Sequence, residues 1–120
     1  MKRDVLNKWV AALRSGKYEQ GRGNLCKDNK FCCLGVLLDI ENVPYDLKDG
    51  LRLYGEYRDV NGVIPSRLAD EYKMISGLGF SSDTENYRSL FFLNDTDKLS
   101  FNEIADHLEK HADKYMEIED

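Results

Sequence analysis

The segment Lys17–Ile40, KYEQGRGNLCKDNKFCCLGVLLDI, decides the fold of this chain. Its first half is polar and contains Gly21 and Gly23, which reach backbone conformations that are closed to residues with a Cβ. Its second half holds the longest apolar run in the sequence, which should anchor the polar half in the core. A polar loop on a rigid apolar support is typical of a binding loop.

The bulk composition predicts one folded domain that spans residues 1–120. The formal net charge is −5, and no basic stripe is visible, so binding to duplex nucleic acid is disfavoured. The start of the sequence lacks the apolar stretch of a signal peptide. The apolar run is also far shorter than the roughly 20 residues that cross a bilayer. We therefore expect a cytoplasmic protein that does not associate with membranes.

The reactive side chains do not form a recognisable catalytic or metal site. Cys26, Cys32 and Cys33 are odd in number and include an adjacent pair, which fits neither a disulfide framework nor a zinc site. Reduced cysteines that serve as small apolar core residues fit better. His107 and His111 lie among acidic residues near the C-terminus, where a solvated surface is the ordinary interpretation. We expect no enzymatic activity, no metal and no cofactor.

Periodicity and capping signals predict several helices. An apolar stripe predicts a helix over 4–15, with Gly16 placed for a left-handed C-terminal cap. A second helix is expected over 66–74, after a proline. The pattern Ser100-x-x-Glu103 is a capping box, which predicts a C-terminal helix.

The remaining segments predict strands and loops. Residues 51–60 alternate in polarity before Asn61-Gly62, which indicates a β-hairpin. Residues 76–89 read as a loop and Leu90–Leu93 as a short buried strand. Phe31–Ile40 fits a buried strand or a buried helix, and its cysteines, leucines and Gly35 favour a helix slightly. The expected fold class is α+β, with N- and C-terminal helices packed on a short antiparallel sheet with a central hairpin.

Positive charge gathers around the glycine-containing loop. Five cations stand within seventeen residues: Arg14, Lys17, Arg22, Lys27 and Lys30. Only Glu19 and Asp28 oppose them, so an acidic protein carries a local positive patch here. Arginine together with exposed backbone N–H groups suits a phosphate. A loop that merely connects two elements remains the open alternative.

Aromatic and amide side chains would complete a nucleotide site. Tyr54 on the expected hairpin and Phe80 in a glycine-rich loop can stack on a base, an interaction worth about 1–3 kcal/mol. Asn94 can read a base edge through its amide, although turn formation is the ordinary explanation of an asparagine there. The expected ligand contacts are Gln20, Gly21, Arg22, Gly23, Lys27, Tyr54, Phe80 and Asn94.

Three sequence blocks resemble a family of small proteins that is widespread in phages and prophages. The blocks are 9–23 (WVAALRSGKYEQGRG), 31–39 (FCCLGVLLD) and 93–105 (LND through LSFNEIA), with a weaker block at 64–78. Together they cover most of the chain. The resemblance implies a phage accessory protein that works in the host cytoplasm during infection.

Within that set the chain is similar to the first of the Thoeris anti-defence families. Those proteins are sponges, which bind a cyclic ADP-ribose-type immune signal and sequester it intact. The resemblance implies a homo-oligomer with ligand pockets between subunits, and ligand contacts at Gln20, Arg22 and Asn94 with Phe80 nearby. Cys26 stands where a second arginine is expected, so Lys27 would take that role. A phage inhibitor that contacts a host protein directly, through the acidic segment Ser100–Glu117, is the alternative function.

Overall fold

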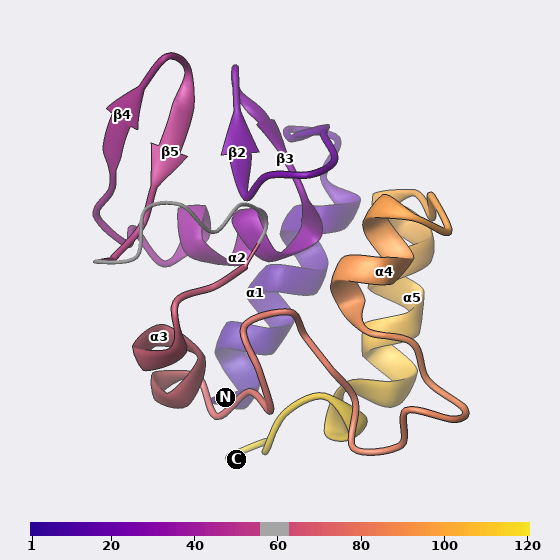
Figure 1. The fold of residues 1–120 in the computed structure, drawn as a ribbon. Coiled ribbons are helices and arrows are strands. Elements are labelled where there is room, and N and C mark those ends of the chain that lie inside the picture. The colour runs from indigo at the N-terminus through magenta and orange to yellow at the C-terminus, as the bar shows by residue number, and fades with distance from the viewer. Residues whose placement is uncertain (56–62) are drawn as a thin grey trace.

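The computed structural model describes residues 1–55 and 63–120 as an α+β fold (Figure 1). Within these residues lie five α-helices, one short 3₁₀ helix and a five-stranded sheet. The helices form the lower part of the molecule as drawn in Figure 1, and the sheet stands above α2. The expected fold class is confirmed, with helices near both ends of the chain and a hairpin in the sheet.

Helix α1, Arg3–Arg14, confirms the helix that the apolar stripe predicts. Its buried face consists of Leu6, Trp9, Val10 and Leu13. Gly16 follows the helix with φ +75°, the left-handed conformation that its position indicated. The Trp9 indole N–H donates to the carbonyl of Cys33 at 2.9 Å, which ties α1 to the next helix.

Most of the ambiguous apolar run Phe31–Ile40 is a helix, and only Phe31 at its start belongs to a strand. Helix α2 spans Cys33–Ile40, and its first six residues are all buried. Such a helix is apolar on every side, so its sequence carries no period that would distinguish it from a buried strand. Gly35 lets it approach the chain before β2, because a Cβ at this position would lie 1.8 Å from the carbonyl oxygen of Leu25.

The sheet consists of five strands of two or three residues each. In spatial order they are β1 (Glu19–Gln20), β3 (Lys30–Phe31), β2 (Cys26–Lys27), β5 (Leu51–Leu53) and β4 (Asp46–Lys48). Only β1 and β3 run parallel, and the other pairs are antiparallel. The loop 17–30 therefore contributes three of the strands and is more ordered than a simple connection.

The hairpin differs in part from its prediction. The expected strand from Leu51 is confirmed for Leu51–Leu53, but it pairs with the preceding β4 around Asp49-Gly50. These two residues have φ of 53° and 81°, the positive values that a type I′ turn requires. The expected turn at Asn61-Gly62 lies outside the described residues.

The predicted strand at Leu90–Leu93 is wrong, because this segment forms helix α4, Leu90–Asp95. The Ser89 hydroxyl accepts a hydrogen bond from the Phe92 N–H and caps the helix. Leu90, Leu93 and Asn94 then share one buried face. Helix α3, Ser66–Glu71, confirms the helix expected after Pro65.

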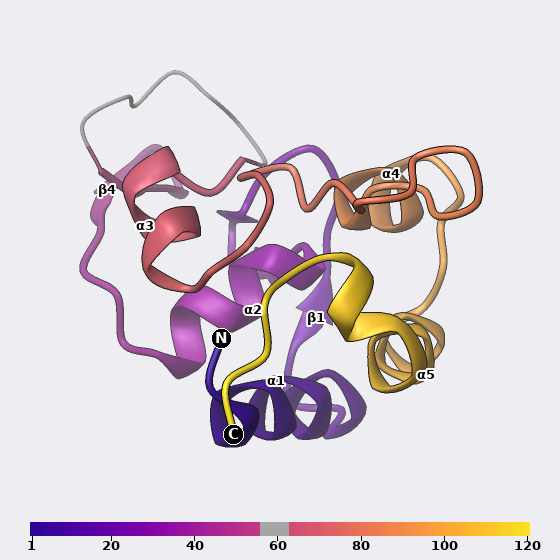
Figure 2. The same cartoon turned by 90° about the horizontal axis from the view of Figure 1, so that it is seen from below.

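Helix α5, Phe101–His111, begins at the predicted capping box and continues as a 3₁₀ turn, Ala112–Lys114. It packs against α1, which also contacts α2. The chain then returns to its start, where the Glu119 N–H donates to the Met1 carbonyl at 2.8 Å. Both views show the two ends of the chain close together (Figure 2).

The capping box provides a stability test. The Ser100 hydroxyl accepts from the Glu103 N–H at 3.1 Å, and the Glu103 carboxylate accepts from the Ser100 N–H at 3.0 Å. We expect Ser100→Ala to lower the free energy of unfolding by about 1 kcal/mol, measured by urea denaturation. The exposed Ser82→Ala change, at a side chain with no hydrogen bond in the described part of the chain, should leave it nearly unchanged. Equal losses in both variants would contradict the cap.

Candidate functional site

The glycine-containing loop is fastened to α4 by a buried amide. Asn94 is fully buried, and its Oδ1 accepts from Gln20 Nε2 at 2.9 Å and from the Cys33 N–H at 3.2 Å. Its Nδ2 donates to the Gly21 carbonyl at 2.9 Å and to the Asp95 carboxylate at 2.7 Å. A primary amide offers two donor hydrogens and two acceptor sites, and all four are used here.

The structure therefore brings Gln20 and Asn94 together, but as partners of each other. Gln20 Nε2 also donates to the Leu99 carbonyl at 2.8 Å, so both hydrogens of its amide are engaged. As they are placed, these two side chains hold the loop against α4 and use their amides on protein partners. Their expected contact with a ligand stays a prediction that would require this cluster to open.

The two glycines also serve the fold. The Gly21 N–H donates to the Phe31 carbonyl at 2.7 Å, and a Cβ on Gly21 would lie 2.9 Å from the Cβ of Lys30. The Gly23 N–H donates to the Asp95 carboxylate at 2.7 Å. The backbone at Gly21 thus comes close to β3 and not to a ligand. The Gly23 N–H, which was expected to face an anion, already donates to a carboxylate of the protein.

Arg22 and Lys27 extend outward from this fixed loop. Both side chains are exposed, and neither makes an ion pair or hydrogen bond within residues 1–55 and 63–120. Arg14, in contrast, leaves the expected patch, because its guanidinium binds Asp106 at 2.6 Å and Glu109 at 2.5 Å. The positive charge that remains available lies on the loop and on the sheet.

Strand register aligns three lysines across the sheet. Lys48 pairs with Leu51, Leu51 with Lys27, and Lys27 with Lys30. Directly paired residues of neighbouring strands point to the same face, so Lys48, Lys27 and Lys30 form one line with Leu51 between the first two. We refer to these three lysines as the cationic row. Figure 1 shows β4, β5, β2 and β3, the strands that carry these lysines and Leu51, side by side.

The three lysines of the cationic row are exposed, and an acidic residue lies at one end of the row. Lys30 Nζ lies 3.8 Å from Glu19 Oε1, whereas Lys27 and Lys48 have no such partner in the described part of the chain. Sequence reasoning missed Lys48, which lies eighteen residues after Lys30. The signal that could have found it is Asp49-Gly50, a hairpin turn that pairs Lys48 with Leu51.

Tyr54 is part of the core and not of this exposed face. Its side chain is buried, and its hydroxyl accepts from Arg52 Nη1 at 3.3 Å. Arg52 also donates to Asp39 at 2.8 Å and lies 4.1 Å over the ring of Tyr45. Burial opposes ionisation of Asp39, but hydrogen bonds from Arg52 and Tyr18 outweigh it and lower the pKa of the carboxyl. This cluster joins the hairpin to α2.

Phe80 is half exposed, as a stacking side chain should be, but it lies in a different part of the chain from the cationic row. The neighbouring Gly79 carbonyl accepts from the Leu90 N–H, and the Ser82 N–H donates to the Lys114 carbonyl. Phe80 therefore sits beside α4 and the C-terminal segment, and no contact in the described structure places it against the cationic row.

The family comparison matches residues 1–112 to a model described as a domain of unknown function, DUF8296. The chain belongs to this family. No curated protein and no solved structure matches the chain. Among the described residues of this DUF8296 chain, no helix is long and apolar enough to cross a membrane.

The cysteines of the DUF8296 chain are buried, as the sequence predicts. Burial raises the pKa of Cys32 to about 12 and that of Cys33 well above its ordinary value. Thiols with such pKa values remain protonated near neutral pH and are poor nucleophiles. Within the described ranges, no three His, Cys, Asp or Glu residues are close enough to hold a metal ion.

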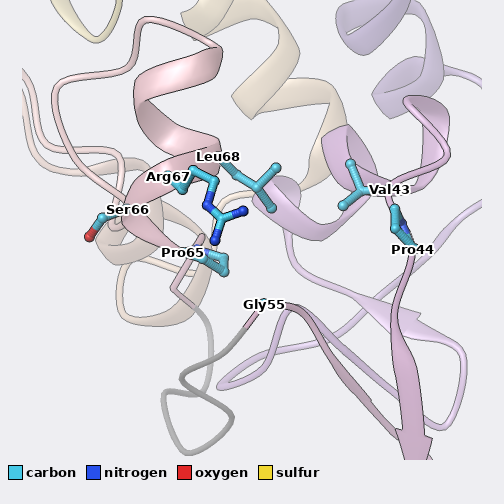
Figure 3. Close-up of a pocket in the computed structure, with 7 residues that line it drawn as sticks. All are labelled: Val43, Pro44, Gly55, Pro65, Ser66, Arg67 and Leu68. Carbon is cyan, nitrogen blue, oxygen red and sulfur yellow. The ribbon is translucent and has the colours of Figure 1, made fainter.

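A separate cavity of about 340 Å³ lies at the base of the hairpin, between the end of α2 and the start of α3 (Figure 3). Its walls are Val43, Pro44, Gly55, Pro65, Ser66, Arg67 and Leu68. The Arg67 guanidinium extends into the space between the apolar walls, and the Ser66 hydroxyl points away from it (Figure 3). None of the eight expected ligand contacts lines this cavity.

Proposed function

We propose that this protein binds a small phosphate-bearing anion at the cationic row and Arg22, and holds it without altering it. The expected ligand is a cyclic ADP-ribose-type molecule or another cyclic nucleotide. The expected role is sequestration of a host immune signal by a phage protein in the host cytoplasm. The alignment of Lys48, Lys27 and Lys30 on one sheet face is the observation that carries the binding proposal.

Electrostatics explains why such a row favours an anion. Neighbouring strands are about 4.8 Å apart, so Lys27 and Lys30 place two like charges side by side, which costs stability. A phosphate between two ammonium groups replaces this repulsion with attraction, and lysine is a common point-charge partner of phosphate. Leu51 lies within the row and offers an apolar contact beside the charges.

Two further features support binding of the ligand without a chemical reaction. The loop that presents Arg22 is fixed from inside by the Asn94 amide, so Arg22 starts from a backbone that is already ordered. Preorganisation reduces the entropy that binding costs. The buried thiols described above are protonated and inaccessible, which agrees with a protein that retains its ligand intact.

The direct test combines binding with recovery of the ligand. Purified protein is titrated by calorimetry with cyclic ADP-ribose, its isomers, and cyclic di- and trinucleotides, then denatured, and the released ligand is identified by mass spectrometry. Binding followed by release of the unchanged molecule supports sequestration. An altered product would indicate an enzyme. No binding to any of these probes would overturn the proposal and favour direct contact with a host protein.

Charge removal at the proposed site tests its location. We expect Lys27→Ala and Arg22→Ala each to weaken binding of the best probe at least tenfold, or about 1.4 kcal/mol, since each removes a phosphate contact. Neither side chain has a protein partner in the described structure, so the melting temperature without ligand should stay within about 1–2 °C. Lys8→Ala on α1, also an exposed lysine, is the matched control. Equal affinities in all three variants would move the site elsewhere.

A further inference from the structure

Two histidines lie about one turn apart on helix α5. His107 and His111 stand at positions i and i+4, the spacing at which two histidines of a helix share one face and can hold one metal ion. Their ring centroids are 5.0 Å apart, and the ring of Tyr87 packs against that of His111 at 4.9 Å. The anion site proposed above uses none of these three rings.

Hydrogen bonding determines which nitrogen of His107 carries the hydrogen. The Tyr115 hydroxyl donates its single hydrogen to the Arg88 carbonyl at 2.7 Å, so toward His107 it can only accept. His107 Nε2 lies 2.7 Å from this hydroxyl and is therefore the donor. The neutral ring carries its hydrogen on Nε2, and Nδ1 keeps a lone pair.

The remaining ring nitrogens reach the surface. Neither His107 Nδ1 nor a ring nitrogen of His111 has a hydrogen-bond partner in the described part of the chain. Among the described residues, however, no buried side-chain nitrogen lacks such a partner. Both histidines are half buried, so their nitrogens without a partner must be accessible from outside.

The pair has two properties of metal-binding histidines. A histidine ligand commonly donates the hydrogen of its other ring nitrogen to a protein group, which fixes the orientation of the ring. The fully buried Tyr115 provides that group for His107. A zinc–nitrogen bond of about 2.0–2.1 Å places the centroid of an imidazole about 3.2 Å from the ion, so two ligating rings at a tetrahedral angle are about 5 Å apart. The observed separation of the two rings agrees with this value.

The surroundings favour binding and not catalysis. Within the described ranges, no third His, Cys, Asp or Glu is close enough to complete the site, so two positions of a tetrahedral ion would stay open to water. Zinc proteases of the H-E-x-x-H type have a glutamate base directly after the first histidine, and this position is Leu108 here. The nearby Glu109 instead binds Arg14 at 2.5 Å.

We infer that His107 and His111 together bind one divalent cation of the kind that prefers imidazole, such as Zn²⁺, Ni²⁺ or Cu²⁺. His107 binds through Nδ1, and His111 binds through a ring nitrogen. This site replaces the sequence-based expectation of no metal, which could not take the hydrogen bond with Tyr115 into account. The inference does not rest on ligand binding at the cationic row, and either can fail without the other.

Titration with Zn²⁺ followed by NMR tests the site directly. The protein is used without a polyhistidine tag, and long-range ¹H–¹⁵N spectra report each ring nitrogen of the two histidines. Zn²⁺ should shift Nδ1 of His107 and one nitrogen of His111, with a dissociation constant between about 10 µM and 1 mM because only two protein ligands hold the ion. No shift of either histidine at about 5 mM Zn²⁺ would overturn the inference.

A substitution at His111 tests whether both rings are needed. His111→Ala removes one ligand but no hydrogen bond of the described structure, so the variant should fold, and its affinity for Zn²⁺ should fall at least tenfold. Lys110→Ala, at an exposed neighbour on the same helix, is the matched control and should bind Zn²⁺ at least as tightly as the native chain. A folded His111→Ala variant with native affinity would overturn the inference.

The choice of ion separates binding by imidazole from attraction to the negative net charge. Cu²⁺ should bind more tightly than Zn²⁺, whereas Mg²⁺ prefers oxygen ligands and should leave both rings unchanged at the same concentration. Equal responses of the two histidines to Mg²⁺ and Zn²⁺ would place the cation on surface carboxylates and overturn the inference.

Discussion

Replacing Asn94 by alanine is expected to lower the free energy of unfolding by about 3–5 kcal/mol. The substitution removes four hydrogen bonds and leaves the Cys33 N–H, the Gly21 carbonyl and one hydrogen of the Gln20 amide without their partner. Each buried polar group left unsatisfied costs about 1–3 kcal/mol. Since the loop 19–23 is held by this amide, its attachment to α4 should loosen in the same variant.

Urea denaturation measures the loss, and Asn102→Ala serves as its control. Asn102 is exposed on α5 and makes no side-chain hydrogen bond in the described structure, so its replacement should change stability by less than about 0.5 kcal/mol. Asn94→Asp keeps the size of the side chain but places a second carboxylate beside Asp95, so it should not restore stability. A loss below about 1 kcal/mol in Asn94→Ala would show that the amide is not needed to hold the loop.

Gly35→Ala is expected to destabilise the fold by at least about 3 kcal/mol, although alanine is the better helix former. In an exposed helix this exchange would gain up to about 1 kcal/mol. Here the new Cβ would lie 1.8 Å from the Leu25 carbonyl oxygen and 2.7 Å from its carbon. A backbone atom cannot rotate out of the way, so α2 and the chain before β2 must separate and open the centre of the core.

The reverse exchange at an exposed position supplies the control. Ala11→Gly on the outer side of α1 should lose about 1 kcal/mol, as helix propensity alone dictates. Thermal and urea unfolding of both variants then separate the effect of helix propensity from the effect of the close contact at Gly35. If Gly35→Ala proved as stable as the native chain, the close approach of α2 to Leu25 would be refuted.

The sequence predicted correctly those helices that are marked by signals within the helix itself or at its ends. The capping box fixed the start of α5, and the apolar stripe with Gly16 fixed α1. The strand prediction for Leu90–Leu93 failed because a run of four apolar residues is too short to show a helical period. The deciding signal there was the capping hydroxyl of Ser89, which stands just before the apolar run.

The candidate site was harder to predict because it depends on pairing between distant segments. Arg22 and Lys27 were recognisable from local charge, and both are exposed as expected. Lys48 joins them only through the register of strands two or three residues long. Gln20 and Asn94 were both expected to contact a ligand, but the sequence gives no sign that their amides bond to each other.

The amide at position 94 holds the loop in place from the inside, so the exposed side chains of the loop are not needed for that task. Because the loop is held from the interior, the side chains at positions 22 and 27 contribute almost nothing to the stability of the fold. Single substitutions at positions 22 and 27 can change the charge and shape of the surface without compensating changes underneath. A lineage under shifting selection can thus vary these exposed side chains in small steps, while the same scaffold persists.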